Sequence, residues 1–219
     1  MLVRHQWTFV DIAAKRNQLS RLLMVRKISA GDLEFRFRSN RLVLDFIATV
    51  GERGHRDIER LDTLDDLDRW IEAAGFAVTE IVLKDEDLAD AKALRYVMVH
   101  VLSDVVAGRT PEGADVYTLN QAAKRPPLRP ELGEGGTSLT WHADVLVPSI
   151  LSTLARDFLQ LLGERTDLDR VKRCADPTCN MYFLDLSRAN NRIWCATDGR
   201  GCGNKAKKRA FVARHRHTS

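Results

Sequence analysis

Apolar residues recur at three- and four-residue steps over much of this chain, a period typical of amphipathic helices. Thr63 is a suitable N-cap for the first such stretch, and Gly75, Gly108 and Gly163 end three of them. Pro111 opens a further helix, because proline is tolerated at the first helical position. The predicted apolar faces are Leu64, Leu67, Trp70, Ile71 and Ala74; Leu88, Ala91, Leu94, Met98, Leu102 and Val105; Val116, Tyr117 and Leu119; and Ile150, Leu151, Leu154, Phe158, Leu161 and Leu162.

The segment 126–142 departs from the helical period. A Gly-rich turn lies between two short runs, of which 138–141 is the more strand-like, so we predict a small β-hairpin. Residues 1–33 form an N-terminal extension, either a docked helix or a disordered leader. The predicted fold is therefore mainly α: a helical domain over 34–165 with this hairpin, then a C-terminal module over 170–219. No Pro/Gly/Ser linker separates the two parts, so they are able to pack together.

Composition is that of an ordinary globular protein. The 219 residues are 44% hydrophobic and 29% charged, and a chain of this length can bury a sizeable core. No apolar run approaches the roughly 20 residues that cross a bilayer, and no apolar signal segment follows the N-terminus. We therefore expect a cytoplasmic protein with no membrane contact, in a compartment where clustered thiols bind metal more often than they form disulfides.

The net charge of +4 combines two regions of opposite sign. Residues 170–219 contain 12 Lys+Arg and three Asp, which gives +9, whereas the remaining 22 basic and 27 acidic residues give −5. A basic end on an acidic body is the pattern of a protein that binds a polyanion. The alternative is a tail that only keeps the chain soluble.

All four cysteines lie in this basic end: Cys174, Cys179, Cys195 and Cys202. They form two close pairs with turn-forming residues inside each, Pro177 in the first and Gly199 and Gly201 in the second. Two such turns can bring four thiolates to the corners of a tetrahedron, the ligand set of a structural Zn²⁺ site, and a catalytic zinc would need an open position. Two disulfides or four unrelated buried thiols are the alternatives. His215 and His217 are further candidate ligands, although solvation is the simpler interpretation of histidines in an Arg-His-Arg-His tail.

The same stretch resembles the CGNR-type zinc finger. The matching positions are Cys174, Cys179, Phe183, Leu184, Asp185, Ser187, Arg188, Asn190, Arg192, Trp194, Cys195, Cys202, Gly203, Asn204 and Lys205. The chain departs from the family pattern at Lys205, where the family has Arg, and in the wider second Cys pair, whose extra glycines are expected to loop out. The resemblance implies a treble-clef-like or ribbon-like zinc module that ends in a basic helix.

Residues 204–216 favour a helix, with Asn204 as a suitable N-cap. Ala206, Ala210 and Ala213 form a smooth strip that fits against the zinc module. The cations then face outward, where they would contact DNA phosphates and reach guanine edges. The candidate nucleic-acid-binding residues are Arg188, Arg192, Lys205, Lys207, Lys208, Arg209, Arg214 and Arg216.

Double-stranded DNA is the partner we expect. RNA recognition uses aromatic side chains that stack on unpaired bases, and at least two of the module's four aromatics, Tyr182, Phe183, Trp194 and Phe211, are needed to cover the zinc core. The alternatives are an RNA-binding or ribosome-associated zinc protein, a protein–protein adaptor with an acidic partner, and a helix that only solvates the C-terminus. Loss of zinc in Cys179→Ser is expected to unfold the module and to leave the helical domain folded.

The helical domain contains no recognisable catalytic constellation, so we expect no enzyme. Asp45 interrupts the apolar run 42–50, and Arg95 interrupts the longest apolar face. A buried acid needs a partner, and Thr49 and Arg53 follow Asp45 at successive four-residue steps of a helix. Two interpretations stay open: a buried Asp45–arginine pair that holds helices together, or a polar pocket for an unidentified small-molecule ligand.

Residues 34–165 resemble the ABATE domain, which accompanies CGNR fingers in stress-induced transcription regulators. The matching positions are Leu42, Val43, Leu44, Asp45, Phe46, Thr49, Arg53, Asp68 to Trp70, Arg95, Leu119 and Asn120. This chain has Ala48 where the family usually has Asn. The resemblance implies a DNA-binding transcription regulator of the stress response whose N-terminal domain senses a ligand or mediates assembly. The candidate ligand pocket then consists of Asp45, Thr49, Arg53, Arg95 and Asn120.

Overall fold

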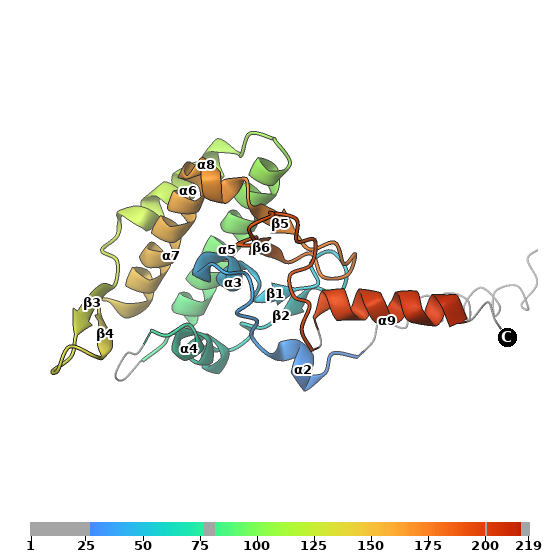
Figure 1. The fold of residues 1–219 in the computed structure, drawn as a ribbon. Helices are drawn as coiled ribbons and strands as arrows, with labels where there is room; N and C mark the ends of the chain where they lie inside the picture. The colour runs from blue at the N-terminus through green and yellow to red at the C-terminus, as the bar shows by residue number, and fades with distance from the viewer. Residues whose placement is uncertain (1–26, 77–81, 200, 216–219) are drawn as a thin grey trace, which may run out of the picture.

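The computed structural model describes residues 27–76, 82–199 and 201–215, and three long helices form its frame (Figure 1). These are α5 (Asp85–Val106), α6 (Gly113–Lys124) and α7 (Leu146–Gly163). α6 packs against both α5 and α7. The prediction of a mainly α fold with small β-hairpins is confirmed.

The predicted start of α6 at Thr110-Pro111 is wrong by a few residues. The helix begins at Gly113, because the preceding Glu112 has extended backbone angles (φ −64°, ψ 138°) and serves as the N-cap. Of the predicted apolar face, only Leu119 is buried, since Val116 and Tyr117 are exposed.

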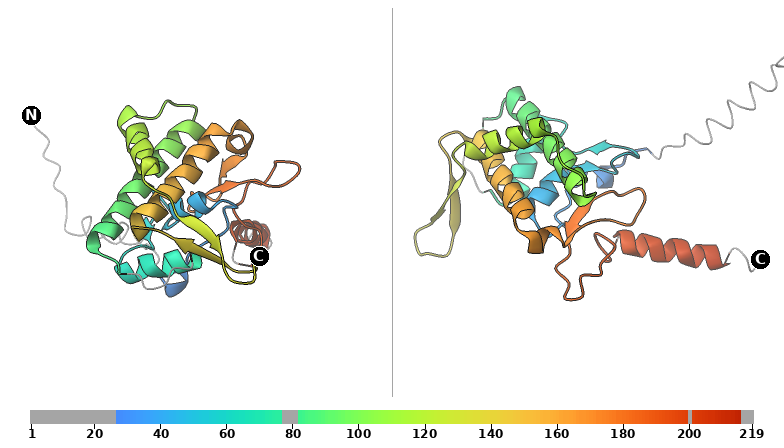
Figure 2. Two further views of the ribbon diagram at one scale, coloured as in Figure 1. Left: turned by 90° about the vertical axis from the view of Figure 1, so that its left-hand side faces the viewer. Right: turned by 90° about the horizontal axis from the view of Figure 1, so that it is seen from above.

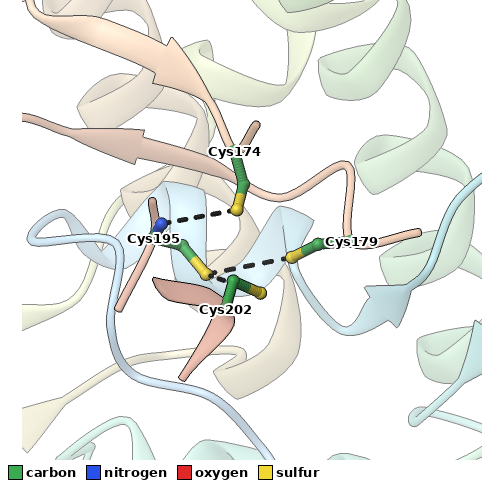
Figure 3. Close-up of side chains that lie close together, drawn as sticks. All are labelled: Cys174, Cys179, Cys195 and Cys202. Carbon is green, nitrogen blue, oxygen red and sulfur yellow. Dashed lines mark hydrogen bonds between the residues drawn. The ribbon is translucent and has the colours of Figure 1, made fainter. Parts of the chain in front are cut away.

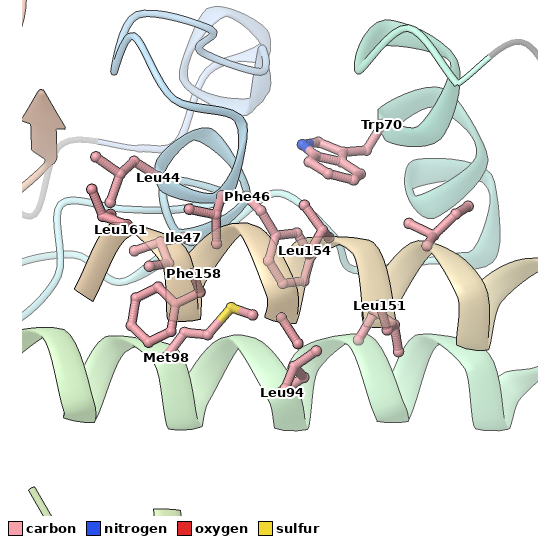
Figure 4. Close-up of a cluster of buried hydrophobic side chains, with 14 of the residues drawn as sticks. Leu44, Phe46, Ile47, Trp70, Leu94, Met98, Leu151, Leu154, Phe158 and Leu161 are labelled. Atoms are coloured by element: carbon pink, nitrogen blue, oxygen red, sulfur yellow. The ribbon is translucent and has the colours of Figure 1, made fainter. Parts of the chain in front are cut away.

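The core lies where α3 (Leu42–Ile47) meets α5 and α7 (Figure 4). Phe46 is fully buried there with the aromatic rings of Phe158 from α7 and Trp70 from α4 (Leu64–Ala73). Thr63 caps α4 as predicted: its hydroxyl accepts a hydrogen bond from the Asp66 N–H, and the Asp66 carboxylate accepts one from the Thr63 N–H. These contacts confirm the apolar pattern as a core prediction.

In the part of the chain that the structure describes, three antiparallel two-stranded sheets lie around this core. β1 (Val50–Gly51) pairs with β2 (Ile58–Glu59), and β3 (Arg129–Leu132) pairs with β4 (Leu139–His142) in the predicted hairpin. β5 (Val171–Arg173) pairs with β6 (Tyr182–Leu184). Short helices α2 (Ala30–Leu33) and α8 (Arg165–Leu168) complete the body. Most of the predicted N-terminal extension, residues 1–26, lies outside the described residues. None of the helices within the described ranges is both long and apolar enough to cross a membrane.

The C-terminal module packs on the helical domain. Val171, Tyr182 and Leu184 belong to the same buried cluster as the helices. The Leu184 N–H donates to the Ser39 carbonyl at 2.7 Å, which ties β6 to the segment before α3. The last helix, α9 (Cys202–His215), leaves this body and projects outward (Figures 1 and 2).

Two predictions for this last helix are wrong. It begins at Cys202 rather than after an N-cap at Asn204, because Asn204 already lies in its first turn and donates to the Gly199 carbonyl. Ala210 and Ala213 are exposed and do not face the module, since the helix leaves the body after its first turns and only Ala206 stays half-buried.

Candidate metal centre and basic helix

Four cysteine sulfurs converge where β5, β6 and α9 meet (Figure 3). Cys174 and Cys179 lie in the turn between the two strands, Cys195 lies in the following loop, and Cys202 is the first residue of α9. In a treble-clef-like arrangement, some metal ligands come from the turn between two strands and others from the start of a helix, as they do here. All four Sγ atoms lie within 4.8 Å of one another.

The spacing of these sulfurs fits a tetrahedral metal. The Sγ of Cys195 is 3.8 Å from that of Cys179 and 3.7 Å from that of Cys202. Four sulfurs at about 2.3 Å from a central Zn²⁺ would be about 3.8 Å apart. These separations exclude sulfur–sulfur bonds, and all four thiols are free. The expected alternatives of two disulfides or unrelated thiols therefore do not describe this cluster.

The protonation chemistry of the cluster also favours a cation. Hydrogen bonds from the Cys179, Cys195 and Cys202 thiols hold the pKa of Cys174 far below its usual value. The same close packing raises the pKa of Cys202, because Cys174, Cys179 and Cys195 and then burial all oppose a further negative charge. Four thiolates together therefore need a divalent cation between them.

The backbone is tightly packed behind the second pair. Gly203 donates to the Ala196 carbonyl at 2.9 Å, and a Cβ at Gly201 would come within 2.7 Å of that same oxygen. Gly199 has φ +40° and open space around it, as expected of a residue that loops out. The expectation that Gly201 also loops out is wrong, because it is buried against the turn before α9.

Asp185 organises the loop between the second and third cysteine. Its fully buried carboxylate accepts hydrogen bonds from Lys172 Nζ at 2.9 Å and from the backbone N–H groups of Ser187 and Arg192 at 2.9 and 2.8 Å. Burial opposes ionisation, but these donors outweigh it and hold the pKa of Asp185 below its usual range. The FLD-x-SR part of the motif thus shapes a loop and does not contribute a ligand.

The structure separates the predicted nucleic-acid-binding residues by role. Arg192 turns inward, donating to the Cys195 carbonyl at 2.6 Å and lying 5.0 Å from the centre of the Phe183 ring. Arg209 pairs with the buried Asp176 at 3.0 Å, which fixes the direction of α9, although its side chain stays 54% exposed. Arg216 lies outside the described residues. Apart from Arg209, the exposed members of the set are Arg188, Lys205, Lys207, Lys208 and Arg214.

Phe211 was not predicted as a functional residue. Its ring is 55% exposed on α9, whereas Phe183 packs with the cysteines and Tyr182 lies in the helical core. Lys207 and Lys208 precede it by four and three positions, and Arg214 and His215 follow at the same spacings, so one helical face combines this ring with the cations. The i±3 and i±4 spacing is the sequence signal that could have found this face.

The five residues of the candidate ligand pocket do not come together. α3 ends at Ile47, so Thr49 and Arg53 do not lie on a helical face with Asp45. Thr49 Oγ1 accepts from Arg95 Nη1 at 2.7 Å, and Arg95 also pairs with Glu59, which the sequence did not single out. Asn120 is exposed on α6.

The Asp45–arginine pair is likewise a wrong prediction. The Asp45 carboxylate accepts hydrogen bonds from the backbone N–H groups of Arg38 and Ser39, both at 2.9 Å. Arg53 instead donates to the carbonyls of Ile47 and Asn180 and lies over the Tyr182 ring. Backbone groups brought close by the fold satisfy both charges, and no periodic pattern of side chains could reveal them.

Comparison with known families agrees with this architecture. Residues 170–215 match the model of the CGNR zinc finger. Residues 40–165 match that of ABATE, described as "Putative stress-induced transcription regulator". No curated protein matches this chain. Since the ABATE model covers more than half of the sequence, the chain belongs to the ABATE family and carries a CGNR zinc finger at its C-terminal end.

Proposed function

We propose that this protein is a transcription regulator that binds duplex DNA through α9, with a structural zinc ion that holds this helix in place. The observation that carries the proposal is the combination of a four-thiolate site at the first residue of α9 with five exposed cations, four of them on α9 itself. A cationic helix fixed at one end is suited to the major groove, where Lys and Arg contact phosphates.

Zinc is the metal that this donor set favours. Four thiolates in a tetrahedron are typical of structural zinc, which supplies folding free energy, and they leave no open position for a reacting water. In this proposal the protein therefore performs no catalytic step. Cys174, Cys179, Cys195 and Cys202 would hold the ion.

The aromatic residues favour duplex DNA over RNA. Single-stranded nucleic acid is bound by stacking on several exposed rings. Tyr182 and Phe183 are buried and Trp194 is half-buried, so Phe211 is the one exposed Phe, Tyr or Trp ring in the described part of the module. A single ring among cations fits an apolar contact with a thymine methyl better than it fits a stacking platform.

The N-terminal domain would serve as the ligand-sensing or assembly part. An open hollow of about 280 Å³ lies among α5, α6 and the start of α7, with Tyr117 and Arg125 in its lining. This hollow, and not the surroundings of Asp45, is the place where a small molecule could bind.

The proposal is tested by binding at a series of salt concentrations to duplex DNA, single-stranded DNA and structured RNA. If the five exposed cations contact phosphates, the log–log slope of duplex affinity against salt is about −4.5. The double variant Lys207→Ala/Lys208→Ala should bind more weakly with a slope shallower by about 2. The matched control, Lys84→Ala/Lys124→Ala, removes two exposed lysines of the helical domain and should change neither value.

Three outcomes would contradict the proposal. Preference for structured RNA would favour the RNA-binding alternative. Equal losses of duplex affinity in the two double variants would show that only the net charge of the protein attracts the nucleic acid. No binding to any nucleic acid, together with binding to an acidic protein, would favour the adaptor.

A further inference from the structure

Arg60 is a buried arginine for which the described part of the chain offers no carboxylate in an ion pair. Arg60 directly follows β2 in the helical domain, and the residue is 2% exposed. Nε donates to the Asp32 carbonyl and Nη1 to the Ala48 carbonyl, both at 2.9 Å. Nη2 is buried and has no hydrogen-bond partner among the described residues. Such a donor is costly unless something nearby offsets it.

The nearby carboxylates are already engaged. Glu52 holds Arg56 at 2.6 Å, and Asp32 lies 3.3 Å from the same guanidinium. Among the described residues no carboxylate forms an ion pair with Arg60. Burial, followed by repulsion from Arg36, lowers the pKa of Arg60 to about 10. Asp32, Glu52 and the Cys179 sulfur act in the opposite direction, so Cys179 is among the groups that favour the charge.

Arg60 also lines a small cavity that reaches the metal ligands. This cavity of about 20 Å³ is lined by Arg60 together with Cys179 and Cys202, and it has room for about one water molecule. Gly51 forms part of its wall, and a Cβ at that position would overlap the Arg60 guanidinium. The absence of a side chain at Gly51 thus leaves room for the Arg60 guanidinium.

The metal site requires positive charge from its surroundings. Zn²⁺ with four thiolates carries a charge of about −2, and cations and N–H groups around such a site must offset it. Two cations of the module are committed elsewhere, since Lys172 pairs with Asp185 and Arg209 with Asp176. Arg60 and Arg53 approach Cys179 from the helical domain, and Cys179 favours the charged form of both.

We propose that the helical domain completes the metal centre, with Arg60 as the positioning residue whose positive charge offsets the net negative charge of the zinc site across the cavity that it shares with Cys179 and Cys202. The inference rests on the zinc part of the proposed function and does not depend on DNA binding. It explains why an arginine with a free N–H is buried at this position, and it makes the metal affinity of the zinc finger a property of both domains.

The test is the zinc affinity of the full chain, measured by competition with a chromophoric chelator. Arg60→Met, which removes the charge and keeps much of the volume, should bind zinc about 10- to 100-fold more weakly, the usual loss when an outer-shell partner of a metal ligand is removed. Arg60→Lys should retain an intermediate affinity. The matched control is Arg95→Met, because Arg95 is also a buried arginine of the helical domain, 5% exposed, but pairs with Glu59 and Thr49. Its zinc affinity should stay close to that of the wild type.

The visible spectrum of the Co²⁺-loaded Arg60→Met protein should still be that of four thiolate ligands, since the arginine is not a ligand. Wild-type zinc affinity in folded Arg60→Met, or equal losses in Arg60→Met and Arg95→Met, would overturn the inference. If Arg60→Met fails to fold, the neutral Arg60→Gln takes its place, because it removes the same charge and keeps a hydrogen-bond donor, and wild-type zinc affinity in folded Arg60→Gln would equally overturn the inference. A wild-type protein that binds no zinc would instead refute the metal part of the proposed function.

Discussion

At the scale of single residues, backbone groups satisfy several of the buried charges. Asp45 accepts two backbone N–H groups, and Arg53 and Arg60 donate to carbonyls of segments far from them in sequence. Each of these residues therefore holds a loop in place. Arg53 and Asn180 do so reciprocally, because the Asn180 side chain also donates to the Arg53 carbonyl.

Asp45 gives a residue-scale prediction. Burial, which outweighs the hydrogen bonds from Ser39 and Arg38, raises the pKa of its carboxyl. When the pKa is raised in the folded state, the carboxyl contributes most to the free energy of unfolding below its unfolded pKa. This contribution is lost as the pH rises through the folded pKa. At neutral pH the carboxylate thus carries a desolvation cost that an amide lacks, while Oδ1 of Asn can still accept both N–H groups. Asp45→Asn should change the free energy of unfolding by less than about 1 kcal/mol, whereas Asp45→Ala should lower it by about 1–3 kcal/mol.

Urea denaturation at neutral pH measures both variants. Equal destabilisation by Asn and Ala would show that the negative charge itself is required. If neither variant lowered the free energy of unfolding, the two N–H groups would have found other acceptors.

The sequence predicted residues whose partners lie at characteristic spacings along the chain, and it missed residues whose partners are brought close only by the fold. Thr63 and the four cysteines were identified because their partners lie at characteristic distances along the chain. The role of Arg60 could not be found in this way. It stands in the polar segment 51–60, and its surroundings come from α2, α3 and the zinc turn.

At the scale of elements, α9 was predictable as a helix but its direction was not. The alanine strip is compatible both with packing on the module and with exposure, and propensity does not distinguish them. The direction follows from contacts at one end: Cys202 in the metal site, Gly203 against the Ala196 carbonyl, and Arg209 on Asp176. A helix of 14 residues is marginal in water without such support.

Phe211 gives the prediction for this element. If its ring contacts bases while the lysines contact phosphates, Phe211→Ala should weaken duplex binding by about 1 kcal/mol or more, roughly fivefold, with the salt slope unchanged. The exposed Val212→Ala serves as a matched control, because it removes an apolar side chain from a different side of α9. A Phe211→Ala variant with wild-type affinity, or one whose slope also falls, would mean that the ring does not read bases.

At the scale of the whole molecule, the two family regions form one packed body. The family boundary falls between residues 165 and 170, yet Val171, Tyr182 and Leu184 lie in the core of the helical domain. Ser39 and Leu184 share a backbone hydrogen bond across it. The absence of a linker in the sequence indicated such packing, but it could not show that the strands flanking the first cysteine pair contribute to the main core.

This packing changes what removal of the metal should do. From the sequence alone, Cys179→Ser was expected to unfold the module and spare the helical domain. Because two of the candidate ligands lie in the turn between β5 and β6, and Val171, Tyr182 and Leu184 of these strands are buried in the helical core, we now expect Cys179→Ser to lower the thermal midpoint of the helical domain as well. Loss of several kcal/mol of metal-binding free energy should shift a single transition by about 10 °C or more. Far-UV circular dichroism reports this shift, since α5, α6 and α7 supply most of the helical signal.

Ala189→Ser, at an exposed non-ligand position in the loop between the second and third cysteines, should retain both zinc and the wild-type midpoint. If the helices of Cys179→Ser instead melt at the wild-type temperature after the zinc is lost, the two parts are energetically independent, and the contacts of Val171, Tyr182 and Leu184 with the core contribute little to either.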